Sequence, residues 1–333
     1  MTCVQILLTP NLPRSVRALA ESLVPAGCSL EILAPAHPGF EAALGAATCI
    51  MGLPRMRFDA ALLARAPQLA LVQLLRAGHE LIDLDAMARE NVQVATVGTV
   101  TSATVAEHCL MLMLALLRRL RWQHAAVERG AWLEAKPWQL PSGEVDSVPE
   151  ARFDGLAGRT LGIVGLGEIG VRVARLAQAF GMTVQATTRD AAAAARDPAR
   201  HGIPIVTLDE LLSTSDVVSL HLRLTPATAQ ILDATAFAKL KPGAFLINTA
   251  RGELVDEAAL LAALARGQLA GAALDTLQKE PPALDHPLLG RDDVLLTPHT
   301  AWLTADSWRS TLAFGFANVE RFRNGQPLLG RVT

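Results

Sequence analysis

Three glycines with the spacing G-x-G-x-x-G lie between an apolar stretch and a helix-like stretch, and this pattern strongly limits the fold. Gly165 permits a tight turn, Gly167 lets the main chain approach a pyrophosphate, and Gly170 lets helix and strand pack closely. Because a strand precedes them and another is expected near residue 183, the pattern predicts a parallel α/β sheet with a dinucleotide at the turn. A glycine turn that binds nothing is the alternative.

Short apolar stretches alternate with helix-like stretches along the chain, in two series. The strands expected in the first series are residues 4–9, 30–33, 48–52, 69–75 and 92–97. The second series begins at residue 160, and its helices are expected at 168–180, 208–215, 234–240 and 256–266. The alternation predicts an α/β fold with two Rossmann-like or flavodoxin-like domains, parallel sheets, and an active site in the interdomain cleft.

The chain of 333 residues is long enough for two domains. We expect residues 1–101 and 300–333 to form a discontinuous substrate-binding (catalytic) domain, because the helix-like segment 304–323 is free to cross back to the first domain. Residues 102–299 would form the dinucleotide-binding Rossmann domain.

Residues 101–130 read as one long helix that is apolar over too wide an arc for a surface position. We therefore expect it to be buried between domains or between subunits. Residues 131–157 are rich in proline, glycine and charge, and they predict a surface excursion or linker. Trp132 and Trp138 in this excursion either cover a subunit's active site or only pack the excursion.

Composition argues against several classes of partner. The formal net charge is -2, so nothing favours nucleic acid or an anionic membrane, and no apolar run approaches the roughly 20 residues of a membrane helix. The N-terminal stretch lacks the features of a signal peptide. The four cysteines have no metal-ligand spacing, so we expect no metal site and reduced, buried thiols in a cytoplasmic protein; they are Cys3, Cys28, Cys49 and Cys109.

The end of the strand near residue 187 bears on which dinucleotide is bound. A carboxylate there would accept hydrogen bonds from the ribose 2′-OH and would repel a 2′-phosphate. Thr188 occupies about that position and Arg189 follows it, which removes the repulsion and supplies a cation. We therefore favour NADP(H) over NAD(H). The alternative is that Arg189 points into solvent and that Asp190 bends back to the ribose.

Three side chains near the carboxyl ends of later strands form a coherent chemical set: Arg251, Glu280 and His299. Ligands of open α/β sheets lie at that end of the strands. Hydride transfer to a ketone needs a proton donor for the C2 oxygen, and histidine titrates in the right range. A guanidinium holds a carboxylate bidentately, and a glutamate beside the histidine favours its protonated form and fixes its orientation.

The chain resembles the D-isomer-specific 2-hydroxyacid dehydrogenase family over most of residues 70 to 310. The segments that carry the resemblance are RAGHELIDLDAM, TVAEH, LGIVGLGEIG, HLRLTPATAQIL, LKPGAFLINTARGELVDEAAL, GAALDTLQKEPP and LLTPHTA. The family includes glyoxylate and hydroxypyruvate reductases. The resemblance implies that Arg251 is the catalytic arginine, Glu280 the acid and His299 the acid/base, that the turn at Ala77 and Gly78 holds the substrate carboxylate, and that a homodimer forms around the 101–130 helix.

These matches also imply which residues contact the substrate and the cofactor. We expect a small 2-keto or 2-hydroxy acid to contact Ala77, Gly78, Arg251 and Trp302, although Trp302 is as consistent with core packing. The residues expected at the cofactor are Thr104, Gly165, Gly167, Glu168, Ile169, Gly170, Thr188, Arg189, Leu222, Arg223, Thr228, Thr249, Ala250, Asp275 and His299.

The chain departs from the family pattern at three places. His79 and Glu80 stand where an aromatic residue and an aspartate are usual, which weakens inference about the substrate side chain. Arg223 stands where proline is common and is a second candidate for a 2′-phosphate, with a plain surface arginine as the alternative. Formate-type relatives carry glutamine in place of the catalytic glutamate, so Glu280 argues against that branch.

Other polar residues have structural interpretations. His108 on its apolar helix and His221 at a strand end are expected to be structural, Asp275 to support the active-site loop, and Asp256 to cap a helix. Two other functions remain open: a dinucleotide-sensing regulatory protein on the same scaffold, and a phosphite-type dehydrogenase. The intact set of arginine, glutamate and histidine argues against the regulatory role.

Overall fold

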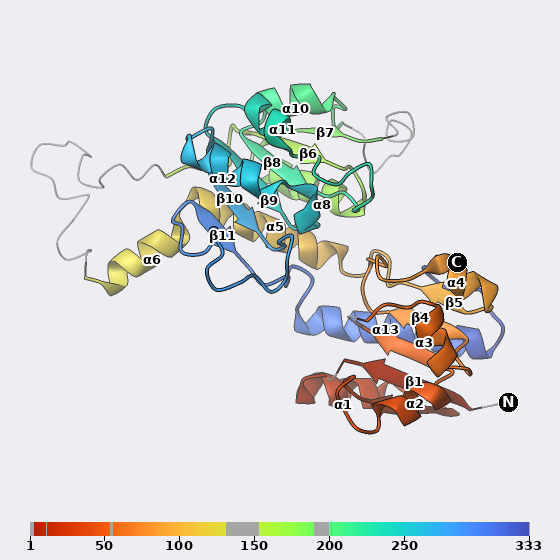
Figure 1. Ribbon diagram of the computed structural model, residues 1–333. Coiled ribbons are helices and arrows are strands. Elements are labelled where there is room, and N and C mark those ends of the chain that lie inside the picture. The colour runs from red at the N-terminus through yellow and green to blue at the C-terminus, as the bar shows by residue number, and fades with distance from the viewer. Residues whose placement is uncertain are drawn as a thin grey trace, which may run out of the picture. The chain divides into compact units, whose positions relative to one another are not determined.

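The computed structural model describes residues 3–10, 12–53, 56–130, 153–189, 200 and 202–332. They form two compact units (Figure 1). Unit 1 comprises residues 1–101 and 303–333, and unit 2 comprises residues 102–302. The loop that carries His299 therefore belongs to unit 2 as far as Trp302.

Unit 1 is built on a five-stranded parallel sheet with the strand order β2-β1-β3-β4-β5. The strands are β1 (Val4–Thr9), β2 (Cys28–Ile32), β3 (Cys49–Gly52), β4 (Leu71–Leu74) and β5 (Gln93–Ala95). The helices are α1 (Arg14–Ser22), α2 (Phe40–Ala46), α3 (Ala60–Arg65), α4 (Leu84–Arg89) and α13 (Ala305–Arg323). One apolar cluster joins α2, α3 and α4 to one face of the sheet, and a second joins α1 and α13 to the other.

Unit 2 is built on a six-stranded parallel sheet with the order β11-β10-β9-β8-β6-β7. The strands are β6 (Thr160–Val164), β7 (Thr183–Thr187), β8 (Val217–Leu220), β9 (Ala244–Asn248), β10 (Leu269–Leu274) and β11 (Val294–Leu296). The helices are α5 (Ser102–Leu117), α6 (Leu120–Glu128), α8 (Glu168–Ala179), α10 (Leu208–Thr214), α11 (Ala234–Lys239) and α12 (Glu257–Ala265), with a 3₁₀ turn η2 (Gly252–Leu254).

Helices cover both faces of the unit 2 sheet (Figure 1). Side chains alternate between the faces along each strand, so Ile163 packs toward α5 and α8 while Val164 packs toward α10, α11 and α12. This is the doubly wound α/β arrangement that the alternating sequence predicts. The two parallel sheets confirm the predicted fold class.

The prediction of a single helix over 101–130 is wrong. Arg119 adopts a left-handed conformation with φ of 50°, and the chain turns there from α5 into α6. The amide of Asp154 donates to the carbonyl of Leu117 at 3.0 Å, so a residue distant in sequence satisfies the end of α5. The apolar surface of α5 packs on α8 and the sheet of its own unit, whereas α6 has no buried residue.

The cysteines also correct the sequence interpretation in part. Cys49 and Cys109 are buried, and burial raises the pKa of the Cys109 thiol to about 12. Cys3, however, is exposed at the start of the chain, and Cys28 is half-buried on an edge strand. The local apolar pattern did not reveal that β2 is the outermost strand, which depends on the sheet order.

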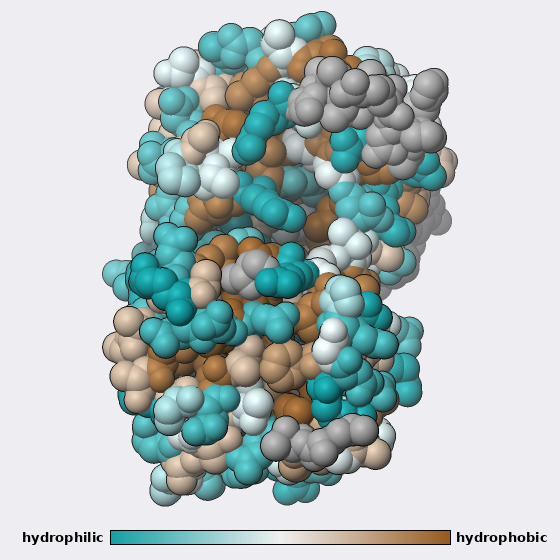
Figure 2. Space-filling model, turned by 90° about the vertical axis from the view of Figure 1, so that its right-hand side faces the viewer, coloured by the Kyte–Doolittle hydropathy of each residue, from teal (hydrophilic) through white to brown (hydrophobic). Residues whose placement is uncertain are grey.

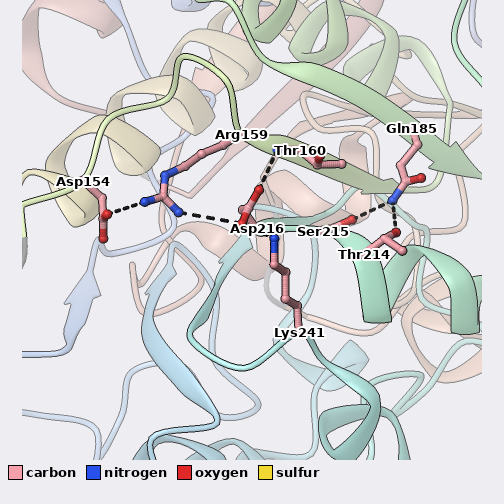
Figure 3. A network of polar contacts seen from close by, with 8 residues as sticks. All are labelled: Asp154, Arg159, Thr160, Gln185, Thr214, Ser215, Asp216 and Lys241. Carbon is pink, nitrogen blue, oxygen red and sulfur yellow. Dashed lines mark hydrogen bonds and ion pairs between the residues drawn. The ribbon is translucent and has the colours of Figure 1, made fainter.

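A polar network stabilises the amino ends of the unit 2 strands (Figure 3). The carboxylate of Asp216, just before β8, accepts the amide of Thr160 at 2.8 Å and the Lys241 ammonium at 2.7 Å. Burial opposes ionisation of Asp216, but these partners and Arg159 hold its pKa below the usual range. Arg159 also pairs with Asp154. These charges lie at the end of the sheet opposite to the carboxyl ends that carry the predicted site.

The surface of the chain mixes residue types. The face drawn in Figure 2 intersperses hydrophilic and hydrophobic residues among those that are coloured. Within the described residues, no helix is long and apolar enough to cross a membrane.

Candidate active site

The glycine turn has the geometry that a pyrophosphate needs. Gly165 has φ of 102°, and a Cβ there would lie 2.8 Å from the carbonyl oxygen of His221. A Cβ on Gly170 would lie 2.4 Å from the carbonyl oxygen of Gly165, so strand and helix pack closely. Gly167 is exposed, and nothing lies within 4 Å of its Cβ position. Because α8 begins directly after it, the turn presents main-chain amides to open space, and these residues fit a dinucleotide.

The end of β7 lies beside this turn, since the amide of Gly165 donates to the carbonyl of Thr187 at 3.0 Å. Thr188 is half-buried and Arg189 is exposed. Asp190, the alternative partner for the ribose, lies outside the described residues, and so do Trp132 and Trp138. No acidic side chain therefore occupies the two described positions that follow the strand.

The loop after β8 carries Arg223, the second candidate for contact with a 2′-phosphate. Arg223 is exposed, and its carbonyl accepts the hydroxyl of Thr228 at 2.7 Å. Thr228 Oγ1 also accepts the amide of Thr225 at 2.8 Å, so this threonine holds the turn closed. Leu222, in the same loop, lies against Gly165. The structure thus brings Arg223 and the glycine turn to neighbouring loops of unit 2.

The Arg251 turn is fixed by a residue that the sequence interpretation missed. The Asn248 amide at the end of β9 donates to the carbonyl of Arg251 at 2.8 Å, and its oxygen accepts the amide of Ala250 at 3.0 Å. One side chain thus bridges the turn from inside. The Arg251 guanidinium donates to the carbonyl of Ala250 at 2.7 Å. Thr249, also expected at the cofactor, is buried.

Gly252 is a second residue that was missed. A Cβ at this position would lie 2.0 Å from the carbonyl carbon of Leu277 and 2.4 Å from the amide nitrogen of Gln278. The Arg251 turn therefore packs directly on the main chain of the loop that leads to Glu280. The only available sequence signal was the glycine next to the arginine in TARGEL, which alone does not reveal a contact with residues 25 positions away.

Glu280 and His299 form the central pair of the site. His299 Nδ1 donates to Glu280 Oε2 at 2.7 Å, while Glu280 Oε1 accepts the amide of Leu277 at 3.2 Å. The side chains are 42% and 35% exposed, so the imidazole is reachable while its partner is held in place. With Nδ1 engaged, Nε2 is the ring nitrogen left for a reacting oxygen.

The electrostatics of this pair favour an ionised carboxylate. Burial alone would raise the pKa of Glu280. The hydrogen bond and charge of His299, the amide of Leu277 and the charge of Arg251 outweigh this and lower the pKa of Glu280 below its ordinary value. The carboxylate therefore stays ionised to a lower pH than that of a free glutamate, and Arg251 acts on it from close by.

His299 has a left-handed main-chain conformation with φ of 56°. Its amide donates to the carbonyls of Asp275 at 2.8 Å and Thr297 at 3.0 Å. The Asp275 carboxylate accepts the amides of Thr300 at 2.9 Å and Ala301 at 2.8 Å. Non-glycine residues seldom adopt this conformation, and such residues cluster at functional sites. These hydrogen bonds agree with the expectation that Asp275 supports this loop. The Asp275 side chain is buried.

The other residues expected at the substrate and the cofactor lie in both units. Ala77 and Gly78 lie in unit 1, just past the carboxyl end of β4. Trp302 is half-buried at the end of unit 2. Thr104 lies in the first turn of α5, and Glu168 and Ile169 in the first turn of α8, where Glu168 pairs with Arg172 at 2.8 Å.

The two histidines that the sequence predicts to be structural, His221 and His108, have polar partners. His221 Nε2 lies 2.9 Å from the hydroxyl of Ser219, and burial lowers the pKa of His221 to about 4. His108 Nε2 lies 3.1 Å from the hydroxyl of Thr297. Asp256 caps α12 as predicted, with its carboxylate accepting the amides of Ala258 and Ala259. Among the described residues, no group of histidine, cysteine, aspartate and glutamate side chains could hold a metal ion.

Comparisons with known proteins agree with this geometry. The family model described as "D-isomer specific 2-hydroxyacid dehydrogenase, NAD binding domain" matches residues 110–301. Hydroxypyruvate reductase of Blautia hydrogenotrophica is 32% identical over 282 residues, which cover 83% of this chain and 81% of that protein. Glycerate dehydrogenase of Methylorubrum extorquens is 34% identical over 288 residues, with 85% and 84% covered.

A solved structure extends the likeness to nearly the whole chain. The TT0316 protein from Thermus thermophilus superposes with a TM-score of 0.84 at 31% identity, covering 99% of this chain and 100% of that one. Because the family model spans more than half of the chain and relatives above 30% identity align along most of it, the chain belongs to the D-isomer specific 2-hydroxyacid dehydrogenase family and is an oxidoreductase that uses a nicotinamide dinucleotide.

Proposed function

We propose that the chain catalyses reversible, NADP(H)-dependent reduction of a small 2-keto acid, of the glyoxylate or hydroxypyruvate type, to the corresponding 2-hydroxy acid, with the D configuration where C2 is a stereocentre. The observation that carries this proposal is the 2.7 Å pair of His299 and Glu280, beside an arginine whose turn packs on the same loop. The names of two relatives, hydroxypyruvate reductase and glycerate dehydrogenase, support a three-carbon substrate.

In this proposal each side chain has one task. Arg251 holds the substrate carboxylate through its guanidinium, and the main-chain amides of Ala77 and Gly78 add hydrogen bonds to it. The bound nicotinamide supplies or accepts the hydride at C2. His299 gives a proton from Nε2 to the C2 oxygen during reduction and takes it back during oxidation. Glu280 keeps the imidazole oriented and stabilises its charged form through Nδ1.

The cofactor preference rests on Thr188, Arg189 and Arg223. Neither described position after β7 is acidic, so no carboxylate there repels a 2′-phosphate. Two exposed guanidinium groups are available for charge-assisted hydrogen bonds to that phosphate. We therefore assign NADP(H) as the preferred cofactor.

We also propose a homodimer that uses α5 and α6. Met111 is 46% exposed on α5, and Leu120 and Val127 on α6 are 57% and 49% exposed. Exposed large apolar side chains of this kind are common at subunit interfaces. Light scattering of the purified chain should give twice the monomer mass, and a variant with Leu120→Asp and Val127→Asp should give one monomer mass.

The decisive experiment measures initial rates of NADPH and NADH oxidation with glyoxylate, hydroxypyruvate, pyruvate and phenylpyruvate at matched concentrations. We expect turnover, a higher rate with NADPH, and the best rate with glyoxylate or hydroxypyruvate. His299→Ala should lose turnover by at least about a hundredfold and still bind dinucleotide. A wild-type protein that binds dinucleotide without reducing any keto acid would contradict the proposal and favour the sensing role or a non-carbon substrate such as phosphite.

A further inference from the structure

A partly buried hydrogen-bonded chain runs from α5 to the loop that carries His299. His108 Nε2 lies 3.1 Å from Thr297 Oγ1, and Thr297 Oγ1 lies 2.6 Å from Asp275 Oδ1. The side chains at its two ends, His108 and Asp275, are 15% and 0% exposed, and Thr297 between them is half-buried. His108 lies on α5, Asp275 directly follows β10, and Thr297 directly follows β11.

Hydrogen-bond chemistry fixes the direction of this chain. The Asp275 carboxylate can only accept, so the single hydroxyl proton of Thr297 is donated to it. The oxygen of Thr297 is then an acceptor for His108, whose Nε2 carries the proton. Burial lowers the pKa of His108, although the charge of Asp275 opposes this. The direction of the chain is the same for either protonation state, because Nε2 carries the donated proton in both.

Asp275 transmits this arrangement to the acid/base loop. Its carboxylate accepts the Thr297 hydroxyl and the amides of Thr300 and Ala301. Thr297 precedes His299 in the chain, and Thr300 and Ala301 follow it. The Asp275 carbonyl accepts the amide of His299 itself at 2.8 Å. His108, Thr297 and Asp275 therefore form a hydrogen-bonded frame that holds the main chain around His299. His108 is the member of this frame that lies farthest along the hydrogen-bonded chain from His299.

We propose that His108 and Thr297 are positioning residues that hold the His299 loop in its working geometry through Asp275. This inference rests on the proposed function, because it assigns His299 as the group that moves the proton. Neither residue needs to touch substrate, and three hydrogen bonds connect His108 to the amides of Thr300 and Ala301. A displacement of about 1 Å at an acid/base group can cost about a hundredfold in rate.

The test compares isosteric and conservative variants in the full chain. Thr297→Val removes the hydroxyl and keeps the volume, whereas Thr297→Ser keeps the hydroxyl. His108→Leu removes the donor, whereas His108→Gln keeps a donor near the Nε2 position. We expect the first member of each pair to lower kcat about tenfold to a hundredfold, with the KM for dinucleotide changed less than about twofold, and the second member to recover most of the rate.

A second readout does not depend on turnover. Hydrogen exchange, followed by mass spectrometry of peptides that contain Thr300 and Ala301, reports directly on the two amides that Asp275 accepts. Thr297→Val and His108→Leu should speed their exchange at least about tenfold, and Thr297→Ser should not. If the wild-type chain reduces no keto acid, the proposed function fails while this exchange result still tests the frame.

The matched control is Thr311→Val, because Thr311 is a buried threonine in unit 1 and has no part in the site. It should leave kcat and the exchange of Thr300 and Ala301 unchanged. Equal rates and equal exchange in Thr297→Val and wild type would overturn the proposal. So would a Thr297→Ser variant as impaired as Thr297→Val. If the valine variant does not fold, the two His108 variants give the same comparison.

Discussion

Glu280 Oε2 accepts the Nδ1 proton of His299 at 2.7 Å while Oε1 of the same carboxylate accepts the amide of Leu277 at 3.2 Å. One oxygen thus orients the imidazole and the other anchors the carboxylate to its own loop. Glu280→Gln keeps the shape and removes the charge, so kcat should fall about a hundredfold with little change in dinucleotide affinity. Steady-state rates measure this, and Glu210→Gln, exposed on α10, should behave as wild type.

Arg251→Lys keeps a positive charge and loses the planar fork that matches a carboxylate. We expect the KM for the keto acid to rise about tenfold to a hundredfold, because a lysine cannot make both hydrogen bonds at once. The dissociation constant for NADPH, from fluorescence quenching, should stay within about twofold of wild type. An unchanged KM would place the substrate carboxylate elsewhere.

Gly252→Ala tests the packing of the Arg251 turn on the Glu280 loop. A Cβ would meet the main chain of Leu277 at 2.0 Å, so the two segments must separate. We expect the free energy of unfolding, measured with denaturant, to be about 1 to 3 kcal/mol lower than in wild type. We also expect a reduced kcat. Gly155→Ala is the matched control, since its Cβ has nothing within 4 Å, and a comparable loss there would refute the packing argument.

Arg189→Ala and Arg223→Ala address the cofactor. If either guanidinium contacts the 2′-phosphate, its loss should raise the KM for NADPH about tenfold and leave the KM for NADH unchanged. Thr188→Asp should shift preference toward NADH further, because a carboxylate repels the phosphate and accepts the ribose hydroxyl. Arg266→Ala, on the exposed end of α12, is the control. Equal effects on both cofactors would contradict the assignment.

His221 should make the fold sensitive to acid. Its pKa is about 4 in the folded chain, against 6.5 for an ordinary histidine, because burial disfavours the charged ring. Between these values the unfolded chain binds a proton that the folded chain does not, so the free energy of unfolding decreases as the pH falls from 6.5 to 4. A shift of this size corresponds to a loss of at most about 3 kcal/mol. Denaturant unfolding at several pH values should show that the free energy of unfolding decreases less in His221→Gln than in wild type.

Much of this site could be predicted from the sequence because its signals are local. The glycine turn follows directly after a strand, and Arg251, Glu280 and His299 come shortly after β9, β10 and β11. In a parallel sheet the carboxyl ends of neighbouring strands meet at one edge. Residue type and strand end were therefore enough to group these three side chains.

The features that were missed depend on contacts between distant parts of the chain. Gly252 meets Leu277, and His108 meets Thr297 across 189 positions. Near the break at Arg119, the carbonyl of Leu117 accepts the amide of Asp154, which lies 37 positions further along the chain. Periodicity describes which side of a helix is apolar, but it does not say which partner will satisfy a hydrogen bond from another element.

The division of the chain into units also sets an order of events during synthesis. Residues 102–302 are one continuous stretch, whereas unit 1 is completed only by α13, which follows unit 2 in the chain. Gly315 of that helix lies against Met51 and Leu75, so the early strands lack part of their cover until then. During synthesis, all residues of the dinucleotide-binding unit are therefore available for folding before unit 1 is complete. This reverses the usual order, in which the amino-terminal domain folds first.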